Sequence, residues 1–256
     1  ISSDIYKNSL ILVFIFGILI RLYMLFKNYS FFYDEAMLME AITGKTYSDM
    51  FKGLEYMQVA PPFFLVASKF LIDNIPQMND YIRDFIPKII PFICGMLSIP
   101  IFYKLIKSVT DNKAFIFFAL FIFLFNPLTI NYCTVFKQYS MELLVSITLI
   151  YVFYQMNFNN KYRILYSAVV FLAPWFSLSS LFIIIPYGLF ILNKDRKLFC
   201  KIFIPFFISC ILFYSFYFQN VFEINYVKMN DYWLPNSMGY FSIYKPLKFL
   251  INIGQF

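Results

Sequence analysis

Long apolar runs, separated by short polar stretches, constrain this chain more than any other feature. Seven runs approach the length of a membrane span: Leu10–Phe26, Ile89–Ile106, Ala114–Ile130, Tyr139–Met156, Ile164–Trp175, Leu178–Leu192 and Ile202–Phe218. A helix needs about 20 mainly apolar residues to cross a bilayer, so flanking residues must extend the shorter runs. The pattern predicts an all-α polytopic membrane protein with about seven transmembrane helices.

Composition and charge agree with this class. Hydrophobic residues make up 61% of the chain and charged residues 14%, against roughly one half and one quarter in soluble domains. The formal net charge is +7, but the Lys and Arg residues fall in short clusters between the apolar runs. Such clusters are typical of topology signals, so we exclude nucleic acid as a partner and expect membrane lipid instead.

Cysteine and histidine usage narrows the chemistry further. The four cysteines show no CxxC spacing, and the chain has no histidine. A disulfide framework, a thiolate metal site and a histidine general base are therefore not expected. Any metal ion would have to use oxygen ligands such as carboxylates.

The domain organisation follows from the runs. We expect one membrane domain over residues 1–256, with a first extracytoplasmic loop at 27–88, spans two to seven at 89–218, and an outer loop at 219–256 in which a further span begins. The chain opens with Ile1, not Met, and stops at Phe256 within an apolar segment, so we expect a fragment of a longer protein. We expect the first run to be a retained membrane anchor, because no cleavage signal follows it.

A further apolar segment, Pro61–Ile75, decides the topology. It opens with two prolines, carries Lys69 and is short for a span. If it does not cross, every basic cluster falls on the side of Lys7: Lys104/Lys107/Lys113, Lys161/Arg163 and Lys194/Arg196/Lys197/Lys201. The bias of Lys and Arg toward cytoplasmic loops favours this choice. We therefore expect a juxtamembrane or re-entrant helix on the outer side, where the polar loops would form a cleft.

Two adjacent acids, Asp34 and Glu35, follow the first run in that outer loop. Met37, Leu38, Ala41 and Ile42 repeat at helical spacing after them, so the acids would begin an interfacial helix. Acids are favoured at helix starts for capping and dipole reasons alone. Capping and chemistry are equally compatible with the pair at this stage.

Four short motifs resemble one family. Tyr33-Asp34-Glu35-Ala36, Gln58-Val59-Ala60-Pro61-Pro62, the segment 132–139 (Tyr-Cys-Thr-Val-Phe-Lys-Gln-Tyr) and Ala173-Pro174-Trp175-Phe176-Ser177 occur in this order. Together they resemble the membrane-embedded GT-C glycosyltransferases, and most closely the bacterial family-39-like branch related to protein O-mannosyltransferases and aminoarabinose lipid A transferases. Two positions depart from the family pattern, since Cys133 stands for Ser and Lys137 for the Arg of many relatives.

The resemblance implies a polyprenyl-phosphate sugar donor and transfer to an acceptor on the outer face of a bacterial inner membrane, with inversion. Asp34 would be the base, and Glu35 would orient it, hold a metal or contact the acceptor. A divalent metal ion, on Asp34 or Glu35, is a possible cofactor. The acceptor stays open among protein, lipid A and a cell-wall polymer.

Several further residues are candidates for binding, from the resemblance or from their position, and each has a plainer alternative. Lys137 would hold the donor phosphate with Tyr139 nearby, or would snorkel at a span end. Gln58 would bind sugar hydroxyls or cap the Pro-Pro helix, and Arg21 would be a second anion partner or snorkel. Arg83 would match a family arginine or pair locally with Asp80 and Asp84. Trp175 and Trp233 would be interface aromatics, and Tyr232-Trp233 would form, as a less favoured alternative, a sugar platform.

Two other functions compete with the enzyme. A transporter or flippase of a lipid-linked glycan would need ionisable residues deep in the spans, of which Glu142 is the main example. A non-catalytic membrane scaffold would need none of the site residues.

Overall fold

The computed structural model describes residues 3–27, 29–56, 58–75, 79–156 and 159–221. Within these ranges the chain is helical, without a strand. The elements are α1 (Ser3–Lys27), α2 (Tyr33–Ile42), η1 (Ser48–Phe51), α3 (Pro62–Asn74), α4 (Asp80–Phe85), η2 (Ile86–Lys88), α5 (Ile89–Val109), α6 (Lys113–Phe125), α7 (Pro127–Tyr132), α8 (Tyr139–Met156), α9 (Lys161–Phe176), η3 (Leu178–Ser180), α10 (Leu181–Lys194), α11 (Arg196–Phe213) and a π-helical turn, η4 (Tyr214–Phe218).

Four helical stretches are long and apolar enough to cross a membrane: Ile5–Lys27, Asp80–Val109, Tyr139–Met156 and Arg196–Val221. This supports a helical membrane protein, although seven spans were expected. The other three expected spans correspond to α6, α9 and α10, with 13, 16 and 14 residues. At 1.5 Å per residue, a 13-residue helix covers only about 20 Å of a hydrocarbon core of about 30 Å.

The expected run Ala114–Ile130 is two helices, because the chain breaks at Asn126. The Asn126 side chain accepts a hydrogen bond from the Leu128 backbone N–H at 2.8 Å, and Pro127 occupies the first position of α7. Asn at the cap and Pro at the first position are both favourable helix starts. A tightly turned α7 therefore follows α6 instead of one long span.

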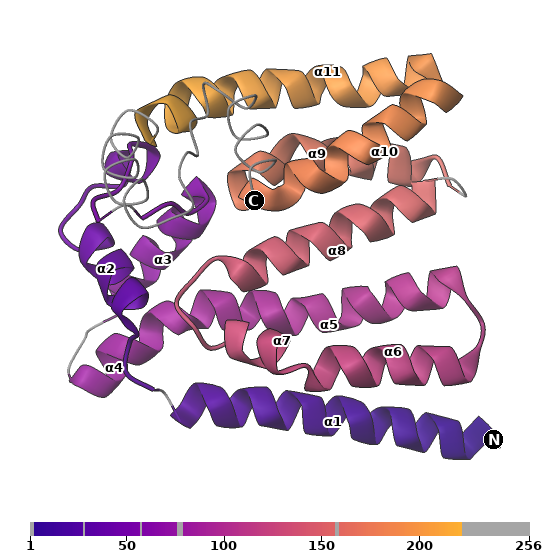
Figure 1. Ribbon diagram of the computed structural model, residues 1–256, viewed down its shortest axis with the longest axis horizontal. Helices are drawn as coiled ribbons and strands as arrows, with labels where there is room; N and C mark the ends of the chain where they lie inside the picture. Colours follow the sequence, from indigo (N-terminus) through magenta and orange to yellow (C-terminus); the bar gives the residue numbers. More distant parts are fainter. Residues whose placement is uncertain (1–2, 28, 57, 76–78, 157–158, 222–256) are drawn as a thin grey trace, which may run out of the picture.

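The longer helices lie side by side and share two ends (Figure 1). One end carries α2, η1, α3, α4, α7 and the turn at residues 133–138, and we call it the α2 end. The other carries the start of α1, the end of α8, the start of α9 and the turns at 110–112 and 194–196, and we call it the basic end, since the basic clusters named above lie there. Helix α3 lies beside α2 and does not run along the bundle. The side of a membrane that each end faces stays a prediction.

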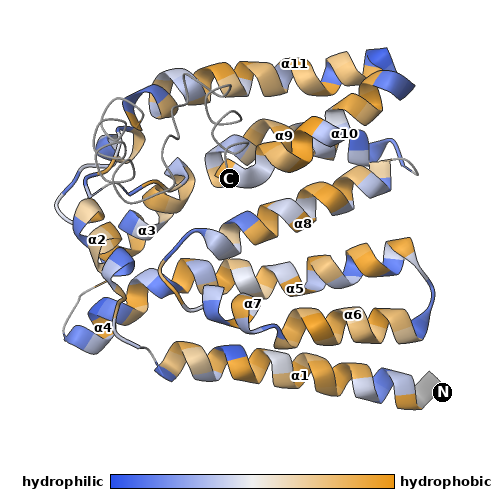
Figure 2. Cartoon of the chain, viewed as in Figure 1, coloured by the Kyte–Doolittle hydropathy of each residue, from blue (hydrophilic) through white to orange (hydrophobic). Residues whose placement is uncertain are grey.

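Hydropathy is distributed as this arrangement requires. The apolar residues cover the middle of α1, α6 and α11, whereas hydrophilic residues gather at the two ends (Figure 2). Many large apolar side chains on α1 and α11 are exposed, among them Phe16, Leu19, Ile204 and Ile211. Exposed apolar belts of this kind suit lipid contact, because they would be unfavourable in water.

Two large apolar clusters hold the fold together, and a smaller third one joins α1, α5 and α6. One joins α2, η1 and α3 to the 133–138 turn through residues that include Leu38, Phe64 and Phe136. The other packs α8 through α11, with Tyr166, Ile184 and Phe203 among its members. The first cluster fixes the α2 end, where the sequence places its candidate residues.

Candidate active site

The first turn of α2 separates the two acids by burial. Phe32 is the N-cap residue in an extended conformation, and the Glu35 Oε2 atom accepts a hydrogen bond from its backbone N–H at 3.0 Å. Glu35 is only 2% exposed, whereas the neighbouring Asp34 is exposed. Capping by a carboxylate satisfies an amide that the helix itself leaves without a partner. The capping interpretation therefore holds for Glu35 and not for Asp34.

Glu35 also connects α2 to a distant part of the chain. Its Oε1 atom accepts a hydrogen bond from the backbone N–H of Phe136. Both carboxylate oxygens are thus bound to backbone amides, one in its own helix and one in the 133–138 turn. A buried carboxylate needs such partners, because an unpaired one would be very costly. Glu35 positions the turn, and Asp34 is the carboxylate left facing outward.

The 133–138 turn is held from three sides. The Phe136 ring lies 6.0 Å from that of Phe31 and 5.8 Å from that of Phe64, measured between centroids. The Gln138 side chain donates to the Val59 carbonyl at 3.3 Å. Cys133 packs on Gly95 of α5, where an added Cβ would lie 2.1 Å from the Cys133 sulfur. Only glycine at position 95 permits this approach.

Lys137 is nearly buried at the centre of this turn. It is 9% exposed, and its Nζ donates to the Gln58 Oε1 atom at 2.7 Å. Burial lowers the pKa of Lys137, while the negative charges of Asp34 and Glu35 act in the opposite direction. The ammonium group is therefore less stabilised than a solvated one. An anion bound beside it would offset the cost of burying its charge.

Gln58 and Tyr139 complete the group around Lys137. The Gln58 amide nitrogen donates to the Tyr56 carbonyl at 3.3 Å, which leaves its oxygen turned to Lys137. The Tyr139 ring lies 4.7 Å from that of Tyr132, and the Tyr139 hydroxyl interacts electrostatically with Asp34. Five residues expected at the site thus come together: Asp34, Glu35, Gln58, Lys137 and Tyr139.

One member of this group was missed in the sequence. Lys88, in the 3₁₀ turn η2 before α5, is buried and donates to the Tyr29 carbonyl, with its Nζ 5.3 Å from the centre of the Phe31 ring. The Lys88 ammonium also interacts electrostatically with the carboxylates of Glu35 and Asp84. The sequence does carry a signal for Lys88: it is a lysine directly before an apolar run, on the side where basic residues are few. Lys137 carries the same signal.

Arg21 does not belong to the group around Lys137. It is 1% exposed within α1, and its guanidinium donates to the carbonyls of Gly17, at 3.0 Å, and Leu124, at 2.7 Å. It also donates to the Thr129 hydroxyl at 3.1 Å. A cation at the carbonyl end of α6 is a favourable helix cap. Arg21 therefore joins α1 to the α6–α7 junction and neither snorkels nor faces an anion site.

Arg83 lies outside the group as well. Its exposed side chain on α4 pairs with Asp80 at 2.9 Å and with Asp84 at 3.1 Å. The local ion pair, the plainer alternative, is the arrangement found. Tyr232 and Trp233 lie outside the described residues.

An apolar cavity of about 320 Å³ begins next to Gln58. Its lining is Val59, Pro174, Ser177, Leu178, Leu181, Cys210, Phe213, Tyr214, Tyr217, Phe218 and Val221. Tyr217 donates to the Ala60 carbonyl, and Glu142 hydrogen-bonds Ser179 and the Leu178 backbone, so α11, α8 and the α9–α10 turn are all tied to this region. The polar residues around Lys137 and the apolar cavity are therefore linked by two consecutive residues: Gln58 contacts Lys137, and Val59 lines the cavity.

Trp175 contributes to packing at this end. Its indole N–H donates to the Ser209 hydroxyl at 3.0 Å, and its ring lies 5.9 Å from that of Phe63 and 5.5 Å from that of Phe213. A Trp with a satisfied N–H between three helices is a structural anchor.

The two acids differ in how they could contact a metal ion. Among the described residues, no three or more Cys, Asp or Glu side chains are grouped together. Because Glu35 uses both oxygens on backbone amides, a metal ion here would rest on Asp34, water and substrate oxygens.

Comparison of the chain with protein-family models, with curated proteins and with solved structures found no match.

Proposed function

We propose that this chain is part of a glycosyltransferase that moves a sugar from a polyprenyl-phosphate donor to an acceptor hydroxyl on the outer face of a bacterial inner membrane. The observation that carries the proposal is an exposed carboxylate, Asp34, near a nearly buried ammonium, Lys137, whose protonated form the Asp34 charge favours. Glycosyl transfer from a phosphate needs these two groups, a proton acceptor and a cation.

In the proposed reaction the acceptor oxygen attacks the anomeric carbon while its proton passes to the Asp34 carboxylate. The bond between the anomeric carbon and the phosphate oxygen breaks, and the polyprenyl phosphate departs with the electron pair. Lys137 stabilises the charge that grows on the departing phosphate. Attack opposite the leaving group in a single displacement inverts the anomeric carbon.

The surroundings of Lys137 support a lipid-linked donor. Its ammonium lies against Gln58, and Val59 lines the apolar cavity that begins there. A donor with an anionic head and an apolar tail needs these two environments in contact. Glu35 and Gln58 act by position: Glu35 holds the 133–138 turn, and Gln58 fixes the Lys137 side chain.

The experiment compares membranes that contain the native chain or Asp34→Asn, each given a radiolabelled polyprenyl-phosphate sugar and candidate acceptors. Asp34→Asn keeps the size of the side chain and removes the base, so we expect transfer to fall about 100-fold or more. Glu40→Gln, an exposed acid on the same helix, is the matched control and should transfer normally.

Unchanged transfer by Asp34→Asn would remove Asp34 as the base. Movement of the labelled lipid across the bilayer, without transfer, would favour the flippase. Neither activity in any preparation would favour the scaffold.

A further inference from the structure

A second cavity lies far from the candidate active site, between α9 and α11 toward the basic end. It has a volume of about 660 Å³, and its lining is Asn160, Arg163, Ile164, Ser167, Ala168, Phe171, Leu172, Leu198, Lys201, Ile202 and Pro205. None of these residues belongs to the group around Asp34 and Lys137. This cavity, which we call the α9–α11 groove, is therefore separate from the candidate active site.

The apolar part of the groove is built by helical spacing. Ile164, Ala168 and Leu172 follow one another at intervals of four on α9, and Leu198 and Ile202 do so on α11. Residues at this spacing share one face of a helix. Ile164 is 78% exposed and Leu172 is also exposed, so the groove presents an apolar strip to its surroundings. Ala168, with its small side chain, lies in the middle of this strip.

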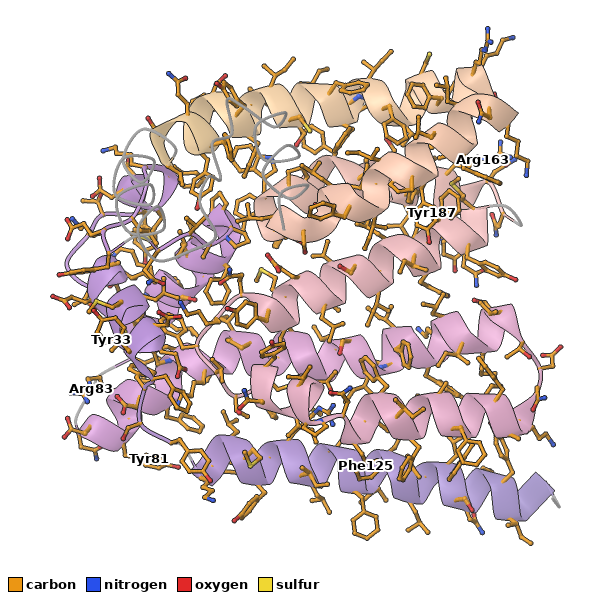
Figure 3. All side chains as sticks on the ribbon, viewed as in Figure 1. Tyr33, Tyr81, Arg83, Phe125, Arg163 and Tyr187 are labelled. Atoms are coloured by element: carbon orange, nitrogen blue, oxygen red, sulfur yellow. The ribbon has the colours of Figure 1, made fainter. Side chains whose placement is uncertain are left out.

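Two cations lie beside the strip, Arg163 just before Ile164 on α9 and Lys201 just before Ile202 on α11. Arg163 lies one turn before Ser167 on α9, and Lys201 lies one turn before Pro205 on α11. Both are exposed, and within the described residues neither side chain has a hydrogen bond or ion pair. Asp195, the nearest acid along α11, caps that helix by accepting from the Leu198 N–H at 3.0 Å. Arg163 lies at the opposite end of the bundle from Tyr33 and Arg83 (Figure 3).

We propose that the α9–α11 groove binds an anionic glycerophospholipid, with its phosphate between Arg163 and Lys201 and one acyl chain along the apolar strip. Charge complementarity selects the head group, and the exposed strip selects the chain. Basic pockets between membrane helices bind anionic lipid head groups in this way, where a cytoplasmic leaflet supplies them. The proposal does not depend on the proposed glycosyl transfer.

The test measures binding to the purified full chain in detergent by native mass spectrometry. The probes are phosphatidylglycerol and phosphatidylcholine with the same acyl chains. We expect phosphatidylglycerol to bind more tightly to the native chain. A cation near a membrane surface contributes about fivefold in affinity, so Arg163→Gln with Lys201→Gln should lose about 25-fold.

Two further variants separate the head group from the chain. Lys104→Gln with Lys107→Gln removes the same charge at the same end of the bundle, away from the groove, and should change affinity less than about threefold. Ala168→Trp fills the strip without changing charge and should lower affinity about tenfold.

Three results would overturn the proposal. Equal losses in the two double variants would show general charge attraction. Full affinity in Ala168→Trp, or displacement of the lipid by inorganic phosphate at an equal concentration, would show that no acyl chain occupies the groove. Equal affinity for both lipids would show that the cations do not select a head group.

Discussion

The two ends of the helical bundle hold their charged side chains in different ways. At the α2 end, Glu35, Lys88 and Lys137 are buried, and each has a hydrogen-bond partner. At the basic end, Lys161, Arg163 and Lys201 are exposed. A buried charge is costly unless it is partnered, whereas an exposed one costs little. The buried charges at the α2 end are therefore fixed in place by their partners, whereas the exposed cations at the basic end form a surface that can meet anions.

The largest expected effect on stability concerns Glu35. Glu35→Gln would replace one of two accepting oxygens by an NH₂ group, which faces a backbone N–H and cannot accept its hydrogen bond. It would also remove the negative charge near Lys88. We expect the free energy of unfolding, measured by detergent or urea titration in micelles, to fall by about 2 kcal/mol.

Glu40→Gln is the control for this prediction, since Glu40 is an exposed acid on the same helix that accepts a hydrogen bond from the Tyr56 hydroxyl. We expect a change within about 0.5 kcal/mol. Equal losses of unfolding free energy in the two variants would show that the hydrogen bonds of the buried Glu35 add no more stability than those of an exposed acid. The proposed difference between the two ends of the bundle would then be wrong.

The next effect concerns donor affinity. Lys137→Ala removes the buried ammonium, so the Kd for a polyprenyl-phosphate sugar should rise about 10- to 100-fold. Lys137→Arg keeps the charge and should cost about threefold, with Lys52→Ala as an exposed control at the same end. Equal affinity in the Ala and Arg variants would show that Lys137 does not hold the phosphate.

The smallest effect is a pH dependence. Because burial lowers the pKa of Lys137, the folded chain loses this proton at a lower pH than the unfolded chain, whose pKa is about 10.4. Between the two values the unfolded state holds more protons, so this group contributes stability that rises with pH. Binding of a phosphate needs the ammonium form, so donor affinity should fall over the same window, by at most about tenfold per pH unit.

Lys137→Arg should lack this alkaline loss, because arginine stays protonated. The measurement is donor Kd against pH for both forms. Superimposable curves would mean that another group titrates.

Local features of the fold could be predicted from the sequence, because they depend on neighbouring residues. The apolar runs predicted most helices, and the pattern after Asp34 predicted α2. Asn126 followed by Pro127 is a turn signal, but the apolar residues on both sides of it favour one continuous run. Helix α11 begins at Arg196, before the expected start at Ile202, because Asp195 caps it and Lys197 and Lys201 can occupy exposed helical positions.

Long-range pairings could not be predicted in the same way. Glu35 and Phe136 are 101 residues apart, and Arg21 and Leu124 are 103 apart. No local pattern distinguishes an acid that caps its own helix from one that also binds a distant amide. The resemblance predicted that Asp34, Gln58 and Lys137 belong to one site. The difference in burial between Asp34 and Glu35 could not be predicted, because it depends on the packing of Phe31, Phe64 and Phe136.

We predict that the α2 end and the basic end lie on opposite sides of the membrane, with the α2 end outside. In intact cells, one cysteine introduced at the exposed position Tyr33 or Lys161 would be treated with a membrane-impermeant maleimide, after Cys200→Ser and Cys210→Ser remove the native thiols that are not buried. We expect labelling of Tyr33→Cys alone, with Lys161→Cys labelled only once the membrane is opened. Labelling of Lys161→Cys from outside, with Tyr33→Cys protected, would contradict the account.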